Sequence, residues 1–441
     1  MRFFRLTAFF VFVAIIAGCS SGGSHGSDKN KDPMGTLLVS IQDSAANTAI
    51  SAASVAVYDS SNLLVTKGAT DNSGEFEYSL SPETYYIKVA AQGYLPVPPT
   101  NQEALPFEII DDQETTQNVA LDEHPDAGNT GQISGYILTS DLVGVPGVLV
   151  VAKDETLNLT ASAISGPDGE YELYNVNPGT YTLKVYCAGY RDTSDPYSVD
   201  VVASGSYEAD DIEVVVYANA DLSGHISFLA VANGIVDVTL IHPDTLDTIP
   251  GLSTENDAST NTYLLETVPP GTYIVWASFR NDGYVMDPDR ISRFGLPLIT
   301  YSTASTDQEQ DFEVTGAVSI DAPTNGADLV VPEVVDTATP TFTWESYPSA
   351  KEYIIEVFNS KGETIWGGFD SSNIVRHTQI GQQDDSAEFN FDGSATAALQ
   401  DGETYRWKVY ADDDAAENVQ NLISSSEDQM GLFKYVQDST P

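Results

Sequence analysis

The stretch GPDGEYELYNVNPGTYTLKVYCAGY, residues 166–190, decides the fold of this chain. An Asp-Gly turn leads into a short alternating segment, a Pro-Gly-Thr-Tyr turn follows, and a second alternating segment ends at Gly-Tyr. Proline and glycine at these places favour tight turns, and strict alternation predicts strands with an inner and an outer face. The inner face is predicted to hold Tyr181, Leu183, Val185 and Cys187, and the outer, solvated face Thr182, Lys184 and Tyr186.

The same pattern occurs three times along the chain. It reads DNSGEFEYSLSPETYYIKVAAQGY at residues 71–94 and NTYLLETVPPGTYIVWASFRNDGY at residues 261–284. The anchoring tyrosines Tyr85, Tyr181 and Tyr273 stand 96 and 92 residues apart, a period that suits whole small domains better than solenoid repeats. With flanking β-rich runs, each copy counts about seven strands, which is typical of a β-sandwich.

These motifs resemble the carboxypeptidase regulatory-like domain, a transthyretin-like sandwich, and the related collagen-adhesin B-type repeats. The first two copies match this pattern well, whereas the third keeps PPGTY and DGY but lacks a clear D-x-x-G turn. The resemblance covers roughly residues 34–316. It implies a structural or binding module without a peptidase active site.

The C-terminal part has a different pattern. TPTFTWESYPSAKEYIIEVFNSKGETIW, from residue 339, and the later LQDGETYRWKVYAD and GLFKYV resemble a fibronectin type III or immunoglobulin-like sandwich. In such a domain Trp344 and Trp407 would fill the core, Tyr405 would stand near the start of a late strand, and Phe433 would close the last strand.

The predicted fold class is therefore all-β, with tandem β-sandwich domains in a string. Short connectors such as DEHPDAGNTG, residues 122–131, favour a semi-extended arrangement. The predicted segments are a signal peptide (1–18), a lipidated cysteine with a flexible tether (19–33), sandwich 1 (34–123), sandwich 2 (129–217), a divergent sandwich 3 (218–316) and the fibronectin-like domain (317–437).

The N-terminus predicts export and anchoring. Two arginines precede an apolar run too short to span a bilayer, and the run ends at Ile16-Ala17-Gly18-Cys19. This end resembles the bacterial lipobox, which implies cleavage before Cys19 and attachment of lipid to its thiol. Ser20 after the cysteine favours the outer membrane by resemblance to enterobacterial sorting, so the membrane is an expected partner through the lipid anchor.

Acidic residues dominate the charge, with 65 Asp and Glu against 18 Lys and Arg and a formal net charge of −47. Such a field repels phosphate backbones, so nucleic acid is excluded as a partner. The acidity fits either a saline habitat or binding of Ca²⁺, and no cofactor other than Ca²⁺ is expected. The candidate metal ligands are Asp412, Asp413, Asp414 and Glu417, although no cluster has the D-x-D-x-D-G spacing of a calcium loop.

Signals of catalysis are weak, and we predict no enzyme and assign no catalytic residue. GGSHG at residues 22–26 fits a nucleophile-elbow pattern, but it lies in the tether instead of between a strand and a helix. The five histidines are scattered, without metal-ligand spacing. Cys187 is the only cysteine besides Cys19, and we interpret it as a small buried residue rather than a reactive thiol.

One position breaks the repeat. Where the first two copies place Lys88 and Lys184 on the outer face, the third places Trp276. An outward tryptophan is either a stacking platform for a sugar or partner, or a residue that packs against a neighbouring domain. The candidate binding residues are Trp276, Arg280 and Tyr284, with Trp366 of the fourth domain as a further candidate.

These observations predict a non-catalytic cell-envelope lipoprotein that acts as a surface adhesion, scaffolding or binding module, facing either the surface or the periplasm. One alternative is a polysaccharide-binding lipoprotein that serves a degradation or uptake system. Another is a structural spacer that projects the C-terminal domain. The expected partners beyond the membrane are a polysaccharide or a surface protein.

Overall fold

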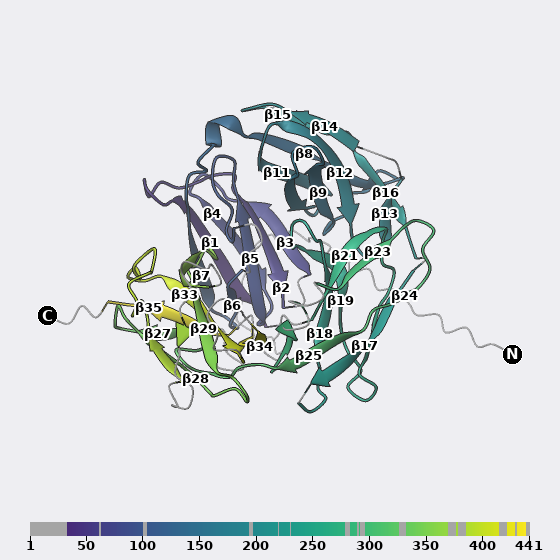
Figure 1. The fold of residues 1–441 in the computed structure, drawn as a ribbon. Helices are drawn as coiled ribbons and strands as arrows, with labels where there is room; N and C mark the ends of the chain where they lie inside the picture. Colours follow the sequence, from purple (N-terminus) through teal and green to yellow (C-terminus); the bar gives the residue numbers. More distant parts are fainter. Residues whose placement is uncertain are drawn as a thin grey trace, which may run out of the picture.

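The computed structural model describes residues 33–60, 63–99, 104–193, 197–218, 220–229, 231–277, 283–288, 291, 296–325, 332–368, 376–377, 385–413, 421–427 and 430–437. These residues form mainly β-strands joined by turns, and the 3₁₀ turn η1 (Ala127–Asn129) lies between the first two sandwiches. The prediction of an all-β chain of tandem sandwiches is confirmed (Figure 1).

The first three sandwiches are built from equivalent strands. The first comprises β1 (Gly35–Asp43), β2 (Ser54–Asp59), β3 (Leu64–Ala69), β4 (Glu75–Leu80), β5 (Thr84–Ala90), β6 (Pro106–Glu108) and β7 (Glu114–Leu121). The second comprises β8 (Gly131–Thr139), β9 (Leu149–Asp154), β10 (Leu159–Ile164), β11 (Glu170–Val176), β12 (Gly179–Tyr186), β13 (Tyr190–Asp192), β14 (Tyr197–Val201), β15 (Ser206–Glu208) and β16 (Ile212–Val216). The third comprises β17 (Leu222–Leu229), β18 (Asp237–Ile241), β19 (Thr248–Glu255), β20 (Thr262–Leu265), β21 (Gly271–Ala277), β22 (Tyr284–Met286), β23 (Leu298–Tyr301), β24 (Gln308–Glu309) and β25 (Phe312–Gly316).

The three sandwiches share one topology. One sheet has the order β3-β2-β5-β6 in the first, β10-β9-β12-β14 in the second and β19-β18-β21-β23 in the third. In the other sheet the opening strand pairs antiparallel with the first strand of the repeat motif and parallel with the closing strand, as β8 does with β11 and β16. The divergent third copy therefore folds like the other two.

A turn residue with a positive φ angle explains how the third copy keeps this fold. Gly74 and Gly169 have positive φ angles of 76° and 82°, and their carbonyls accept bonds of 2.8 Å from Ile41 N and Ile137 N. In the third copy Asn261, with φ 56°, accepts the equivalent 2.8 Å bond from Ile226 N. Asparagine tolerates the left-handed region better than most residues, so it replaces the missing glycine.

The fourth sandwich has a different strand order. Its strands are β26 (Ile320–Ala322), β27 (Glu333–Val335), β28 (Thr341–Trp344), β29 (Glu352–Phe358), β30 (Thr364–Gly367), β31 (Arg376–His377), β32 (Ser386–Glu388), β33 (Thr404–Asp412), β34 (Leu422–Ser425) and β35 (Leu432–Tyr435). A sheet β26-β28-β32 faces a larger sheet β27-β35-β33-β29-β30. The predicted core residues Trp344 and Trp407 are buried between them, together with Tyr405 and Phe433.

The inner faces follow the alternation, whereas one outer face does not. Tyr181, Leu183 and Val185 are buried in the second sandwich, as predicted, whereas Cys187, predicted beside them, is only partly buried. The prediction that Tyr186 is solvated is wrong, because the third sandwich covers it. The core of the third sandwich continues into outward-facing residues of the first two, among them Tyr58, Tyr86, Val151 and Tyr186.

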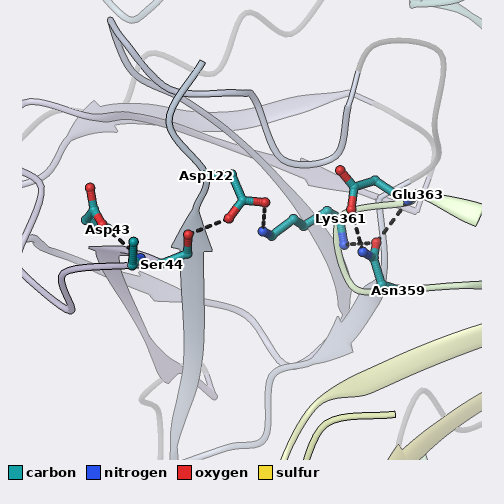
Figure 2. A network of polar contacts seen from close by, with 7 residues as sticks. Asp43, Ser44, Asp122, Asn359, Lys361 and Glu363 are labelled. Carbon is teal, nitrogen blue, oxygen red and sulfur yellow. Dashed lines mark hydrogen bonds and ion pairs between the residues drawn. The ribbon is translucent and has the colours of Figure 1, made fainter. Parts of the chain in front are cut away.

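The sandwiches therefore do not form the semi-extended arrangement that the connectors favoured. They follow one another along the chain but fold back into one body, in which the fourth sandwich lies beside the first (Figure 1). Lys361 of the fourth sandwich pairs with Asp122, which also accepts a bond from Ser44 (Figure 2). Arg406 adds a 3.0 Å bond from its guanidinium to the carbonyl of Ala104.

Candidate binding site at the junction of three sandwiches

The loop at residues 242–247 of the third sandwich, His-Pro-Asp-Thr-Leu-Asp, contacts both preceding sandwiches. Its first residue follows β18, and a turn bond from Leu246 N to His242 O, 2.8 Å, closes it. Two acids in the loop then reach across the interfaces. Asp244 accepts a 2.8 Å bond from Lys153 of the second sandwich, and Asp247 accepts a 2.8 Å bond from Lys88 of the first.

Asp247 is the residue where all three sandwiches meet. One of its carboxylate oxygens binds Lys88, and the other accepts a 2.5 Å bond from the Ser162 hydroxyl. Burial alone would raise the pKa of this carboxyl, but Lys88 and the hydrogen bonds outweigh that effect and hold the pKa below its usual range. In turn, burial would lower the pKa of Lys88, but the Asp247 carboxylate raises it overall, so both groups are charged at neutral pH.

Aromatic rings surround this ion pair. The Lys88 ammonium lies 5.4 Å from the centre of the Tyr58 ring, a cation–π distance. Burial raises the pKa of Tyr58 to about 12, so its hydroxyl stays protonated. On the other side of the loop, the rings of His242 and Tyr186 have centroids 5.0 Å apart, and burial lowers the pKa of His242 although Asp244 and Asp247 oppose this.

Asn175 joins the first two sandwiches. It lies in a bulge of β11 with φ 54°, which turns its side chain towards the Ala91–Tyr94 turn. Its Oδ1 accepts a 2.8 Å bond from Gly93 N, and its Nδ2 donates to the carbonyls of Ala91 and Tyr94 at 3.1 and 2.6 Å. One side chain thus satisfies three backbone groups of the neighbouring domain, a rigid connection between the two sandwiches.

A cavity of 430 Å³ opens at this junction. Tyr58 and Lys88 line it from the first sandwich, Ser162 and Tyr174 from the second, and Asp247 from the third. Lys88 and Asp247 are paired with each other, and Tyr174 donates to Glu172. This arrangement provides hydrogen-bonding groups for a polar ligand.

The residues predicted from the repeat are not all brought together. Trp276 is partly buried and packs against the shared core of the third sandwich. Tyr284 lies on β22, in the opposite sheet, where its ring meets Phe228 edge-on at 5.1 Å and its hydroxyl bonds Ala232 O. Arg280 lies outside the described residues.

Trp366 is a core residue, which corrects its selection as a binding candidate. It is 1% exposed, packs against Phe342 and Phe389, and donates from Nε1 to Asp392 Oδ1 at 2.9 Å. A side chain buried in this way has no face left for a ligand. The strand-end position of Trp366 in the sequence was compatible with either role.

The metal, anchor and cysteine predictions have different outcomes. Asp412 is buried and accepts a 3.0 Å bond from Asn421 N, while Asp413 accepts from the Asn421 side chain; Asp414, Glu417 and the lipidation site Cys19 lie outside the described residues. Among described residues, no group of three or more metal-binding side chains converges.

Burial raises the pKa of the Cys187 thiol to about 12, so the thiolate needed for reactivity is scarce at neutral pH.

Sequence reasoning missed the residues that join the domains. Lys88 was placed correctly on an outer face, but its partner Asp247 is distant in sequence and lies in a loop without a motif. The only usable signal was the shortage of cations: the chain has 18 Lys and Arg against 65 Asp and Glu, so a lysine such as Lys88 is expected to pair with an acid. Asn175 gave a weak signal, since asparagine is enriched where φ is positive.

In comparisons with known proteins, residues 132–221 match the carboxypeptidase regulatory-like domain family. This match confirms the resemblance predicted for the second sandwich. No curated protein matches the chain. Within the described residues, no helix is long and apolar enough to cross a membrane.

Several solved structures are similar to the chain at low identity. The Bacillus anthracis TIE protein is 12% identical over 64% of this chain, with a TM-score of 0.19, and the chain spans about half (51%) of its length. The major pilin subunit BcpA of Bacillus cereus is 12% identical over 64% of this chain and 100% of its own, with a TM-score of 0.19. A streptococcal ancillary pilin is 13% identical over 63% of this chain and 99% of its own, with a TM-score of 0.18. TM-scores this low carry no functional argument.

Proposed function

We propose that the chain is a non-catalytic cell-envelope lipoprotein that serves as a compact scaffolding or binding module. In this proposal, Cys19 carries the lipid, the following tether holds the body off the outer membrane, and the fourth sandwich is a fibronectin type III-like domain. The tyrosine near the start of β33 supports the last point, because Tyr405 OH accepts a 2.6 Å bond from the backbone of Gln400, five residues upstream.

One observation carries the proposal: each sandwich contacts the next one along the chain, and the fourth contacts the first, so that the four form a closed ring. Asn175 joins the first to the second, Ala188 N bonds Pro250 O at 2.9 Å between the second and third, and Gly283 N bonds Glu427 Oε1 at 2.5 Å between the third and fourth. Lys361 and Asp122 then join the fourth to the first. A body held at each junction presents its loops and clefts in fixed positions, as a scaffold or receptor requires.

The same closure argues against a simple spacer. A spacer that projects the C-terminal domain would separate the fourth sandwich from the first, whereas here these two are in contact. A polysaccharide-binding role remains the second candidate, because clefts lined by hydroxyl, amide and aromatic groups lie between the domains. Trp276 and Arg280 stay candidates for a second contact with such a ligand.

Lipid anchoring is testable in a bacterial host that expresses the full chain. We expect a clickable palmitate analogue to label the wild-type protein and the protein to fractionate with the outer membrane. Cys19→Ser should lose both the label and the membrane fraction, while Cys187→Ser, the matched control, should keep both. An unlabelled wild-type chain recovered entirely in the soluble periplasmic fraction would contradict the anchor.

A further inference from the structure

The basic residues of the second sandwich are gathered in one place. Residues 129–217 contain only Lys153, Lys184 and Arg191, against 13 acidic residues. All three line the same 680 Å³ cavity between the second and third sandwiches. In a chain with a net charge of −47, this concentration of cations marks a local exception in a field that otherwise repels anions.

Two sheets form the walls of this cavity. From the second sandwich, Lys153 and Thr182 are register partners on β9 and β12, and Lys184 follows on the same outer face. From the third, Thr272 and Thr300 face the cavity from β21 and β23, with their hydroxyl oxygens 3.0 Å apart. The cleft is thus lined by lysine ammonium groups from the second sandwich and by threonine hydroxyl groups from both sandwiches.

Two of the three cations are available to a ligand. Lys153 is paired with Asp244 at 2.8 Å. Lys184 is exposed and forms no ion pair with any described residue. The Arg191 guanidinium donates to the Asp192 carbonyl at 2.9 Å and lies 5.9 Å from the Tyr217 ring, contacts that leave its charge without a carboxylate in the described part of the chain.

The cavity also holds carboxylates, which limit what it can accept. Asp244 is neutralised by Lys153, while Glu155 and Asp192 lie at the same cavity. A bare polyanion would meet these acids as well as the cations. A ligand with one anionic group among several hydroxyls suits the mixture better, because each hydroxyl can bond a threonine or a carboxylate.

We propose that this cleft binds a carboxylated saccharide, with the sugar carboxylate held by Lys184 and Arg191 and the sugar hydroxyls by the threonines. Arginine matches the planar carboxylate with two parallel N–H groups, and lysine adds a mobile charge. The volume lies within the range of about 300 to 1,000 Å³ that ligand sites occupy. The inference rests on the binding role proposed above and names its ligand class.

The test is calorimetric titration of the full chain with tri-galacturonate, beside neutral galactotriose. We expect binding of the acidic trisaccharide alone, weakened by added salt. Lys184→Ala should raise the Kd roughly tenfold or more, as loss of a charge-assisted bond does. Lys184→Arg should retain most of the affinity. Lys434→Ala, which removes the same charge from the fourth sandwich, should leave the Kd unchanged.

Four results would overturn the inference. They are an unchanged Kd in Lys184→Ala, equal binding of the neutral trisaccharide, binding of inorganic sulfate as tight as that of tri-galacturonate, and no binding by a folded chain. If Trp276→Ala lost binding and Lys184→Ala kept it, the sugar would bind at another site. The cleft proposal would then be wrong, and the polysaccharide-binding role would stand. Failure of every sugar in a chain that still labels at Cys19 would leave the scaffold proposal standing.

Discussion

Gly169 shows how one backbone position decides the repeat. With φ 82° it lies in the region that side chains rarely enter, and a Cβ there would stand 2.3 Å from Ile137 O and 2.9 Å from Gly144 Cα. The turn of the motif therefore depends on glycine for two separate reasons, conformation and space. Tyrosines define the other end of the motif: Tyr85 OH and Tyr273 OH donate to the carbonyls of Ser81 and Pro269, at 3.0 and 2.9 Å, four residues upstream.

At the residue scale, we expect Gly169→Ala to lower the free energy of unfolding by roughly 1 to 3 kcal/mol, from backbone strain and the clash with Ile137. Asn261→Gly, at the equivalent position of the third sandwich, should change it by less than about 1 kcal/mol, because glycine accepts the same φ. Urea unfolding followed by tyrosine and tryptophan fluorescence measures both. Equal effects of the two substitutions would refute the special role of the turn.

The element that positions the domains is the loop at residues 242–247, more than any strand. Its acids are bonded to Lys88 and Lys153 on the outer faces of β5 and β9. Outer-face residues that would be solvated in an isolated sandwich are thereby turned into interface residues. The repeat could keep its inner faces constant while the outer faces changed to fit their neighbours.

At the element scale, stability should depend on pH through Asp247. Its folded pKa lies below the ordinary value of 3.8, so its contribution is present above about pH 4 and is lost as pH falls through the folded pKa. At pH 7, Asp247→Asn should cost about 1 to 2 kcal/mol, a figure reduced because the Lys88 side chain is 41% exposed.

The difference between the wild type and Asp247→Asn should therefore shrink between pH 5 and pH 3. Urea titrations across that range measure it. Asp141→Asn, which changes an exposed carboxylate in the second sandwich, should show no such dependence. If the stability difference stayed constant with pH, the effect of Asp247→Asn would not come from the charge of Asp247, and the prediction would be wrong.

On the scale of the whole molecule, closure depends on contacts between the first and the fourth sandwich. Lys361 and Asp122 pair although they are 239 positions apart in the sequence (Figure 2). The loop that carries Lys361 is itself ordered by Asn359, whose Oδ1 accepts a bond from Lys361 N and whose Nδ2 donates to Glu363. Such contacts join domains that are each complete sandwiches. They add little to any single core and instead fix the relative positions of the four cores.

Small-angle scattering checks this arrangement. A compact chain of 441 residues has a radius of gyration of about 22 Å, and a string of four sandwiches would be far larger. We expect the wild type near the compact value. Lys361→Glu, which places two acids together, should increase the radius without unfolding any sandwich, whereas Lys434→Glu should not. A wild-type radius typical of an extended string would overturn the closed arrangement.

The sequence by itself determined the all-β class, the three repeats, the inner faces of their strands and the core aromatics of the fourth sandwich. These features follow from alternation and turn chemistry, which act over a few residues and are written in the chain as patterns. The tertiary structure alone decided how the outer faces are used: it buried Tyr186, paired Lys88 with Asp247 across 159 residues and gathered three cations at one cleft. The docking of folded domains depends on the shapes of their surfaces and on pairs of charges far apart in sequence. Neither of these produces a periodic pattern in the sequence.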